Sequence, residues 1–240
     1  MLNLSVALGI VRSTANAQSL SKGGPATPPA PSKEILTPAL RQKIYERNDY
    51  TCQACGFRSM KYQDVHFLNG VQTDVRPDNT VTACIFCHQC FRLNQVSEMR
   101  SGVLVWLPEI SQTDLHHIAR AIYVARISQG PVAEASRKAL DVLMQRREEV
   151  RKRLGTDDPF ILAAVLKDYI SDKAYEAREA KLEGIRLFPL DRRIIKEADL
   201  EFNQFPQILA YWRAKDGPFG GMVPRQWIDL YRDITPAKAA

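Results

Sequence analysis

The first hydrophobic residues of the chain alternate with small or polar ones. They are Leu2, Leu4, Val6 and Leu8. A period of two places such residues on one face of an extended chain, so residues 1–12 are predicted to contain a half-buried strand. The next stretch, residues 13–34, is rich in Ser, Gly, Pro and Ala and offers almost no apolar surface to bury. This composition is typical of a flexible linker.

Helical spacing of apolar residues dominates the chain from residue 38 onward. Thr37 and Pro38 occupy the N-cap and first position of a helix that we predict over residues 38–47. Ser111, with Asp114 three residues later, predicts a second capped helix after a strand that ends before residue 109. We expect the buried face of this second helix to carry Leu115, Ile118, Ile122 and Ala125.

A longer apolar stripe begins at Pro131 and ends before Gly155. We therefore expect one helix over residues 131–154, with "RREEVRKR" as its solvated face. The stripe consists of Val132, Ala135, Ala139, Leu143, Val150 and Leu154. Two further helices are predicted, one ending near Tyr169 and one over residues 172–182. The resulting fold class is α+β and predominantly helical.

Composition and charge exclude some classes of protein but do not identify the function. Hydrophobic residues make up 45% of the 240, which is enough to bury a core, and the net charge is +6 with both signs interspersed. The longest apolar run, residues 160–166, is shorter than the roughly 20 residues that cross a bilayer. No basic residue precedes the first apolar stretch, which argues against a secretory signal. We expect the protein in the cytoplasm.

Two pairs of cysteines share one spacing and predict a metal site. Two residues separate Cys52 from Cys55, and Cys84 and Cys87 repeat that spacing. Each pair can present two sulfurs from one tight turn, as a closed tetrahedral zinc site requires. We therefore expect one structural zinc ion per chain, bound by these four residues. Cys90 follows Cys87 at the same spacing and is the alternative ligand, in place of Cys84 or Cys87.

The segment around these cysteines resembles the zinc-containing branch of the HNH, or ββα-metal, nuclease fold. The matching stretches are "LRQKIYERNDYTCQACG", "DVHFLNG" and "DNTVTACIFCH", which span about residues 40–92. The resemblance implies a hairpin and a helix that hold the cysteine pairs, beside a second, catalytic metal. The family's metal ligand, general base, orienting asparagine and helix histidine would fall on His66, Phe67, Asn79 and His88.

Phenylalanine at the general-base position argues against catalysis. Phe67 cannot accept a proton, and a general base contributes roughly 10²- to 10⁴-fold to such reactions. Asp64 is near, but it stands on the same strand face as His66 rather than on that of the base. We therefore expect no catalytic residue, and we interpret His66, Asn79 and His88 as vestigial positions. Asn79 is expected to shape the turn after "RPD".

A second resemblance covers about residues 40–190. The stretches "ERNDYTCQACGF", "YQDV", "NTVTACIFCHQCF", "LVWLPEISQTDL" and "GIRLFPL" are similar to the IcmJ (DotN) family of type IVB secretion and conjugation systems. This resemblance implies a non-enzymatic, zinc-containing adaptor of the coupling complex. Such a subunit would bind the C-terminal tail of the coupling ATPase at the cytoplasmic face of the inner membrane. Residues 35–100 would form the HNH-like zinc module, with a helical region over 101–240 packed on it.

Several positions keep two interpretations. Trp106, Trp212 and Trp227 are candidate anchors for a partner, although burial in the core is the favoured explanation for each of them. His116 and His117 are adjacent on a predicted helix and are expected at the surface. Two other functions remain open, an HNH-type metal-dependent endonuclease and a zinc module that binds DNA without catalysis. Nucleic acid is the less favoured partner, because the basic residues are not interleaved with aromatic ones on one face.

Overall fold

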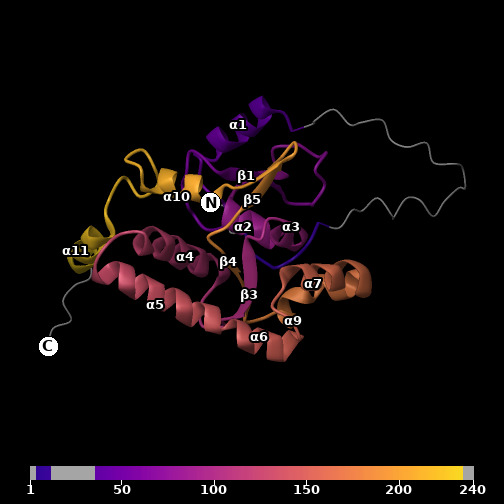
Figure 1. The fold of residues 1–240 in the computed structure, drawn as a ribbon. Coiled ribbons are helices and arrows are strands. Elements are labelled where there is room, and N and C mark those ends of the chain that lie inside the picture. Colours follow the sequence, from indigo (N-terminus) through magenta and orange to yellow (C-terminus); the bar gives the residue numbers. More distant parts are fainter. Residues whose placement is uncertain (1–3, 12–35, 235–240) are drawn as a thin grey trace, which may run out of the picture.

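The computed structural model describes residues 4–11 and 36–234 of the chain. Within these ranges the fold is α+β, with helices around small antiparallel sheets of two strands each (Figure 1). The strand pairs are β1 (Gln63–Phe67) with β2 (Thr80–Cys84), β3 (Gly102–Trp106) with β4 (Ile185–Pro189), and β5 (Ile194–Glu197) with β6 (Leu200–Asn203). The β3–β4 pair joins segments that are far apart in the chain, which ties the later helices to the cysteine-containing half.

The helices of the first half begin where the sequence predicts. In α1 (Pro38–Arg47), the Thr37 hydroxyl accepts the N–H of Leu40 at 3.2 Å, as an N-cap should. Helix α4 (Gln112–Arg126) starts in the same way, because Ser111 Oγ accepts the N–H of Asp114 at 3.1 Å. Between them lie α2 (Ile85–Cys90) and α3 (Leu93–Glu98), which follow β2 directly.

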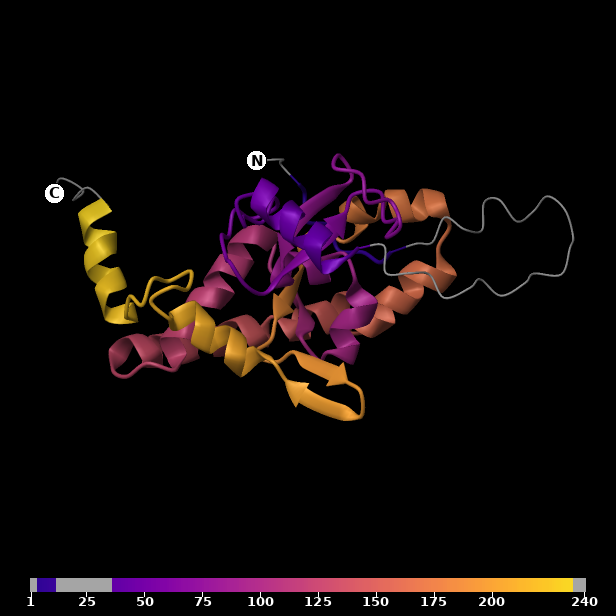
Figure 2. The ribbon, with the colours of Figure 1, turned by 90° about the horizontal axis from the view of Figure 1, so that it is seen from above.

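The second half contains shorter helices. The bounds are α5 (Pro131–Gln145), α6 (Arg147–Leu154), α7 (Pro159–Ala164), the π-helix η2 (Val165–Tyr169), α8 (Asp172–Glu176), α9 (Arg178–Lys181), α10 (Phe205–Arg213) and α11 (Pro224–Ile234). Figure 2 shows α11 projecting from one end of the molecule. No helix in the described ranges combines the length and the apolar character needed to cross a lipid bilayer.

The single helix predicted over 131–154 is wrong, because the structure interrupts it at Arg146 between α5 and α6. The backbone carbonyl of Arg146 accepts the N–H of Trp106 at 3.1 Å, so this carbonyl is hydrogen-bonded to β3 and not within a continuous helix. The buried face of α5 also differs from the predicted stripe. Ala135 and Ala139 are exposed, whereas Ala133 and Ser136 are buried. The helix predicted over 172–182 is similarly divided into α8 and α9.

The strand predicted within residues 1–12 is also wrong for the described residues 4–11, which join no sheet. The N–H of Gly9 donates to the carbonyl of Cys90 at 2.8 Å, and the carbonyl of Gly9 accepts the N–H of Leu93 at 3.0 Å. The Tyr175 hydroxyl donates to the carbonyl of Ile10 at 2.7 Å. Helix termini and a side chain thus satisfy backbone groups that a neighbouring strand would otherwise satisfy. The linker predicted over 13–34 lies outside the described residues.

One of the hydrophobic clusters surrounds the four cysteines of the two pairs. Residues of the segment 52–87 and residues of the segment 105–212 share one buried cluster, so the two parts of the chain pack on each other. Trp212 of α10 is 1% exposed and meets the rings of Phe57 and Phe86 edge-on, at centroid distances of 5.8 and 5.6 Å. Edge-on aromatic pairs of this kind add to the stability that burial supplies.

The three tryptophans have different environments. Trp212 belongs to the core, so the interpretation as a partner anchor is wrong for it. Trp106 of β3 is half-buried beneath Arg153, whose guanidinium lies 3.8 Å from the ring centre. Trp227 of α11 is half-buried and stacked on Phe219 at 5.6 Å.

Candidate metal centre

The structure brings the sulfurs of Cys52, Cys55, Cys84 and Cys87 together at the end of the β1–β2 hairpin. Their ligand atoms all lie within 4.8 Å of one another, and Cys55 Sγ is 3.7 Å from Cys84 Sγ. Four sulfurs bonded at about 2.3 Å to a central ion would lie about 3.8 Å apart at the corners of a tetrahedron. The observed spacing fits that arrangement and is far longer than a disulfide bond of about 2.05 Å. The four cysteines can therefore hold a metal ion.

Each cysteine pair is shaped by its local backbone. In the first pair, the N–H of Gly56 donates to the carbonyl of Cys52 at 2.9 Å, and Gly56 has a φ of 73°, which favours glycine. In the second pair, Cys84 ends β2 and caps α2, with its sulfur accepting the N–H of Cys87 at 3.4 Å. A tight turn and a helix N-terminus thus point the two pairs at one another.

Three of the four cysteines have a lowered thiol pKa, which favours the ionised form that binds metals, whereas hydrogen bonds with Cys52, Cys55 and Cys84 raise the pKa of Cys87. A hydrogen bond with Cys52 is the largest cause that lowers the pKa of Cys55 to about 6. The hydrogen bond with Cys55 raises the pKa of Cys52. The hydrogen bonds with Cys84 and Cys87 lower this pKa by more, so that it is about 7. Free thiols have a pKa near 8.5, and the thiolate is the metal ligand. Cys52, Cys55 and Cys84 therefore ionise more readily than a free thiol does.

Arg120 of α4 is buried against the sulfurs, and sequence reasoning missed it. It is 1% exposed, and its Nη2 donates to Cys84 Sγ at 2.8 Å. The rings of Phe57 and Phe86 flank its guanidinium, with centroids at 4.0 and 5.0 Å. Burial alone would lower the pKa of Arg120, but the neighbouring cysteine thiolates outweigh it and raise the pKa. Arg120 thus supplies a buried positive charge to a site that gathers negative charge.

His116 is fully buried, so the prediction of a surface position is wrong for it. Its Nδ1 lies 3.3 Å from Cys87 Sγ, and its Nε2 lies 2.8 Å from Gln112 Nε2. The amide of Gln112 is held on both sides by the backbone of Leu187, at 2.8 Å each, so Gln112 Nε2 donates to His116. The proton of the His116 ring therefore sits on Nδ1 and is donated to the Cys87 sulfur.

His117 and Cys90 stay outside the sulfur cluster. His117 is exposed, as predicted, and its Nε2–H donates to the carbonyl of Cys55 at 2.8 Å. Cys90 is not among the residues whose ligand atoms converge in the described part of the chain. Its sulfur donates to the carbonyl of Phe86 at 3.4 Å, and burial raises its pKa well above the usual value. A protonated thiol is a poor metal ligand.

The positions that the HNH resemblance singles out do not converge on one metal site among the described residues. His66 stacks on Phe91 with centroids 4.1 Å apart, and burial lowers the pKa of His66 to about 3. His88 Nδ1 lies 3.6 Å from Asp64 Oδ2, and the His66 and His88 ring centroids are 6.1 Å apart. Within the described ranges, no convergence of metal-ligand atoms includes these side chains. Phe67 is buried in a small core beneath α1.

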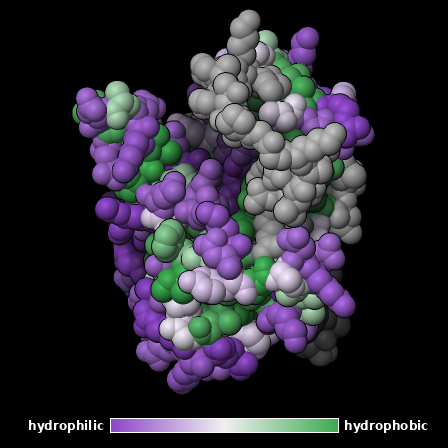
Figure 3. Space-filling view, turned by 90° about the vertical axis from the view of Figure 1, so that its right-hand side faces the viewer, coloured by the Kyte–Doolittle hydropathy of each residue, from purple (hydrophilic) through white to green (hydrophobic). Residues whose placement is uncertain are grey.

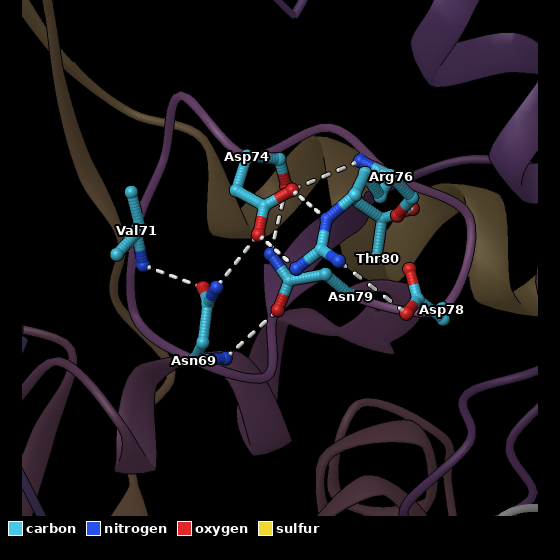
Figure 4. Close-up of polar contacts among 7 residues, drawn as sticks. All are labelled: Asn69, Val71, Asp74, Arg76, Asp78, Asn79 and Thr80. Atoms are coloured by element: carbon cyan, nitrogen blue, oxygen red, sulfur yellow. Dashed lines mark hydrogen bonds and ion pairs between the residues drawn. The ribbon is translucent and has the colours of Figure 1, made fainter.

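Asn79 shapes a loop, as predicted. Its Oδ1 accepts the N–H of Asn69 at 2.9 Å, and its Nδ2 donates to the carbonyl of Asp74 at 2.7 Å (Figure 4). Asp74 in turn pairs with Arg76, with Nη2 and Oδ2 2.7 Å apart. Both polar atoms of the Asn79 amide thus serve the turn between β1 and β2, which leaves neither to orient a base.

Comparison with known proteins extends the similarity beyond the cysteine segment. No family model matches the chain. A curated relative, the type 4 apparatus protein DotN of Legionella pneumophila, is 33% identical over 165 residues. The matched region covers 67% of this chain and 77% of the relative. It is much longer than the segment that carries the cysteines, so the likeness includes later helices as well.

Proposed function

This chain belongs to the DotN (IcmJ) family, and from that premise we propose that it is a non-enzymatic, zinc-containing adaptor of a type IVB-like coupling complex. Membership in a family of type IV secretion apparatus proteins carries the proposal. The cluster of four cysteines supports it, because a site built wholly from protein ligands stabilises a fold and leaves no coordination position for a substrate. The complex would serve secretion or conjugation.

The metal is proposed to be one structural zinc ion per chain. Four thiolates in tetrahedral geometry are characteristic of zinc, and Cys52, Cys84 and Cys87 are almost fully buried. The order β1, β2, α2, with a cysteine pair at each end of the hairpin, supports a degenerate HNH-like module over residues 35–100. The helical region over 101–240 would pack on this module.

The alternative of an HNH-type nuclease makes a direct prediction. We expect the purified protein to leave supercoiled plasmid intact with Mg²⁺, Mn²⁺ or Ni²⁺, because Phe67 is apolar and buried where the base would stand. Agarose gels of a plasmid-nicking time course provide the measurement. Nicking that disappears in His88→Ala would contradict the proposal, whereas nicking that persists would indicate a contaminant. The DNA-binding alternative predicts affinity that falls steeply with salt.

The partner is proposed to be the C-terminal tail of the coupling ATPase at the cytoplasmic face of the inner membrane. An apolar patch on α7 and η2 is a suitable docking surface for an extended segment. It is formed by Phe160, Ile161, Val165 and Tyr169, which are 53, 48, 40 and 80% exposed. Helix α7 lies on the right of Figure 1, and the face seen from that side shows hydrophobic groups among hydrophilic ones (Figure 3). Exposed apolar patches of this kind often mark protein interfaces.

Replacing part of this patch should weaken docking of the tail without unfolding the protein. Phe160→Ser combined with Val165→Ser removes two exposed apolar side chains, each of which contributes about 1.5–3 kcal/mol when buried in an interface. We therefore expect at least a tenfold loss of affinity in isothermal titration with the ATPase tail. Val142→Ser on α5, where the side chain is 58% exposed, is the control outside the patch and should bind normally.

Two outcomes would count against the proposal at different levels. Unchanged affinity of the double variant would remove the α7 patch from the interface and leave the adaptor role intact. Failure of the unmodified, metal-loaded protein to co-purify with the tail would contradict the adaptor role itself. The metal content of each preparation must be measured, since an unfolded module would also fail to bind.

A further inference from the structure

A pocket of about 530 Å³ lies beside the β1–β2 hairpin, among residues of β1, α2, α3 and β5. Strand β1 and helices α2 and α3 form its wall on one side, and the start of β5 closes the other (Figure 1). Arg41 of α1 reaches its rim. This volume is in the range of sites that hold small organic molecules.

Positive charge predominates in the pocket. The charged side chains that line it are Arg41, Arg92, Arg193, Lys196, Asp64 and Glu98. Four cations against two carboxylates leave two positive charges uncompensated within the described residues. A site of this polarity repels the divalent cation that the vestigial HNH positions would have held, and it attracts an anion.

Asp64 does not use the hydrogen-bond donors of the arginines around it. Arg41 Nη1 and Arg193 Nη2 each lie 3.7 Å from its carboxylate oxygens, which is longer than a hydrogen bond. Arg193 is anchored instead by its Nε, which donates to Gln204 Oε1 at 3.2 Å. Asp64 therefore holds both guanidinium groups near one point by charge, and Arg193 Nη2 is not engaged in a hydrogen bond with this carboxylate.

Among the residues that the structure describes, Arg92 also lacks an anionic partner at hydrogen-bond distance. With the Gln72 amide oxygen turned toward it, the terminal nitrogens of Arg92 donate to that neutral oxygen at 2.8 and 3.0 Å. Its buried Nε has no partner among the described residues. Burial lowers the pKa of both Arg92 and Arg193, as expected for guanidinium groups whose charge is incompletely balanced.

An unused buried donor gives the second, independent sign of a ligand. Gln89 is 3% exposed and lines the pocket, and its Oε1 accepts the Ser101 hydroxyl at 2.9 Å. Its Nε2 has no hydrogen-bond partner in the part of the chain that the structure describes, and neither does His88 Nε2. A buried amide left unpaired costs about 1–3 kcal/mol, which a bound acceptor would recover.

We propose that this pocket binds a small organic phosphate monoester. Guanidinium and amide donors together select an oxyanion, and a dianion matches the two uncompensated positive charges. The phosphoryl group would be bound by Arg92, Arg193 and Gln89. Apolar residues also line the pocket, among them Val65, Phe67 and Ile195, and they would pack against the organic part of the ligand. The site is independent of the proposed docking of the ATPase tail.

Calorimetric titration of the full, metal-loaded chain at constant pH and ionic strength tests the site. The probes are phenyl phosphate, inorganic phosphate and benzenesulfonate, which differ in charge and in their apolar part. We expect phenyl phosphate to bind at least tenfold more tightly than the monoanion benzenesulfonate, and more tightly than inorganic phosphate. Arg193→Gln and Arg92→Gln should each weaken phenyl phosphate at least tenfold.

Two further variants keep the test decisive if the buried arginines prove necessary for folding. Lys196 is exposed, so Lys196→Ala should fold normally and bind phenyl phosphate several-fold more weakly. Arg146→Gln removes a surface cation that pairs with Glu109 outside the pocket, and it should bind normally. Equal affinity for phenyl phosphate and benzenesulfonate, or an equal loss in Arg146→Gln, would overturn the site. Equal affinity for phenyl and inorganic phosphate would overturn the assignment to an organic monoester.

Discussion

Cys87→Ala is expected to abolish tight metal binding and to unfold the region around the β1–β2 hairpin, whereas Cys90→Ala should keep both metal and fold. The reason lies in the size of the metal's contribution. A structural zinc site stabilises its module by on the order of 10 kcal/mol, while a whole domain is stable by only about 5–15 kcal/mol. Losing one of four thiolates therefore removes most of the free energy of folding in this region.

The measurement pairs elemental analysis with thermal unfolding followed by circular dichroism. The unmodified protein should contain one zinc ion and unfold cooperatively, and a strong chelator should reproduce the behaviour of Cys87→Ala. Cys90→Ala is the matched control, since both sulfurs are fully buried on α2. The reverse result, with metal lost only in Cys90→Ala, would show that Cys90 is the ligand. A metal-free protein that unfolds at an unchanged temperature would contradict the structural role.

Arg120→Met should lower the affinity of the site for metal by roughly 10- to 100-fold, the usual effect of removing a group that hydrogen-bonds a metal ligand. Four thiolates around a divalent cation carry a net charge of −2. The donor at 2.8 Å from Cys84 Sγ is the buried cation that offsets part of this charge. Removing one partner of a buried charge pair costs about 3–5 kcal/mol. For a chain of this length we expect a fall of roughly 6–20 °C in the unfolding temperature.

A competition titration against a chelator of known affinity measures the first effect, and differential scanning calorimetry measures the second. Arg126→Met lies on the same helix and also removes an arginine, but its partner is the partly exposed Asp191. This control should leave metal affinity unchanged and shift the unfolding temperature only slightly. Arg120→Lys should recover part of the affinity. If Arg120→Met kept its metal affinity while losing stability, Arg120 would serve packing alone.

Local signals in the sequence were reliable wherever one short segment satisfies its own requirements. Thr37 and Ser111 cap their helices as predicted, because a hydroxyl three residues before a free N–H needs no help from the rest of the fold. Asn79 shapes its turn for the same reason. The spacing of each cysteine pair likewise predicts a tight turn that involves only the residues of that pair.

Predictions failed where a distant segment competes for the same atoms. Helix periodicity assigned Ile118 to the buried face of α4, yet it is 39% exposed, and the face turns instead toward His116 and Arg120. A hydrophobic pattern assigns histidine and arginine to the solvent-facing side, because it does not include thiolates that another part of the chain places against the helix. The break between α5 and α6 at Arg146 has a similar origin, since the backbone N–H of Trp106 donates to the Arg146 carbonyl.

The amino-acid order alone was therefore sufficient for the helix caps and for each cysteine pair, which depend on neighbours within a few residues, and for the family resemblance, which rests on motifs spread over about residues 40–190. Only the folded chain decided that Arg120 and His116 face the sulfurs, and that Arg92 and Arg193 line one pocket. Burying a charge or an imidazole is unfavourable unless a partner meets it, and that partner is known only once segments distant in sequence have packed together.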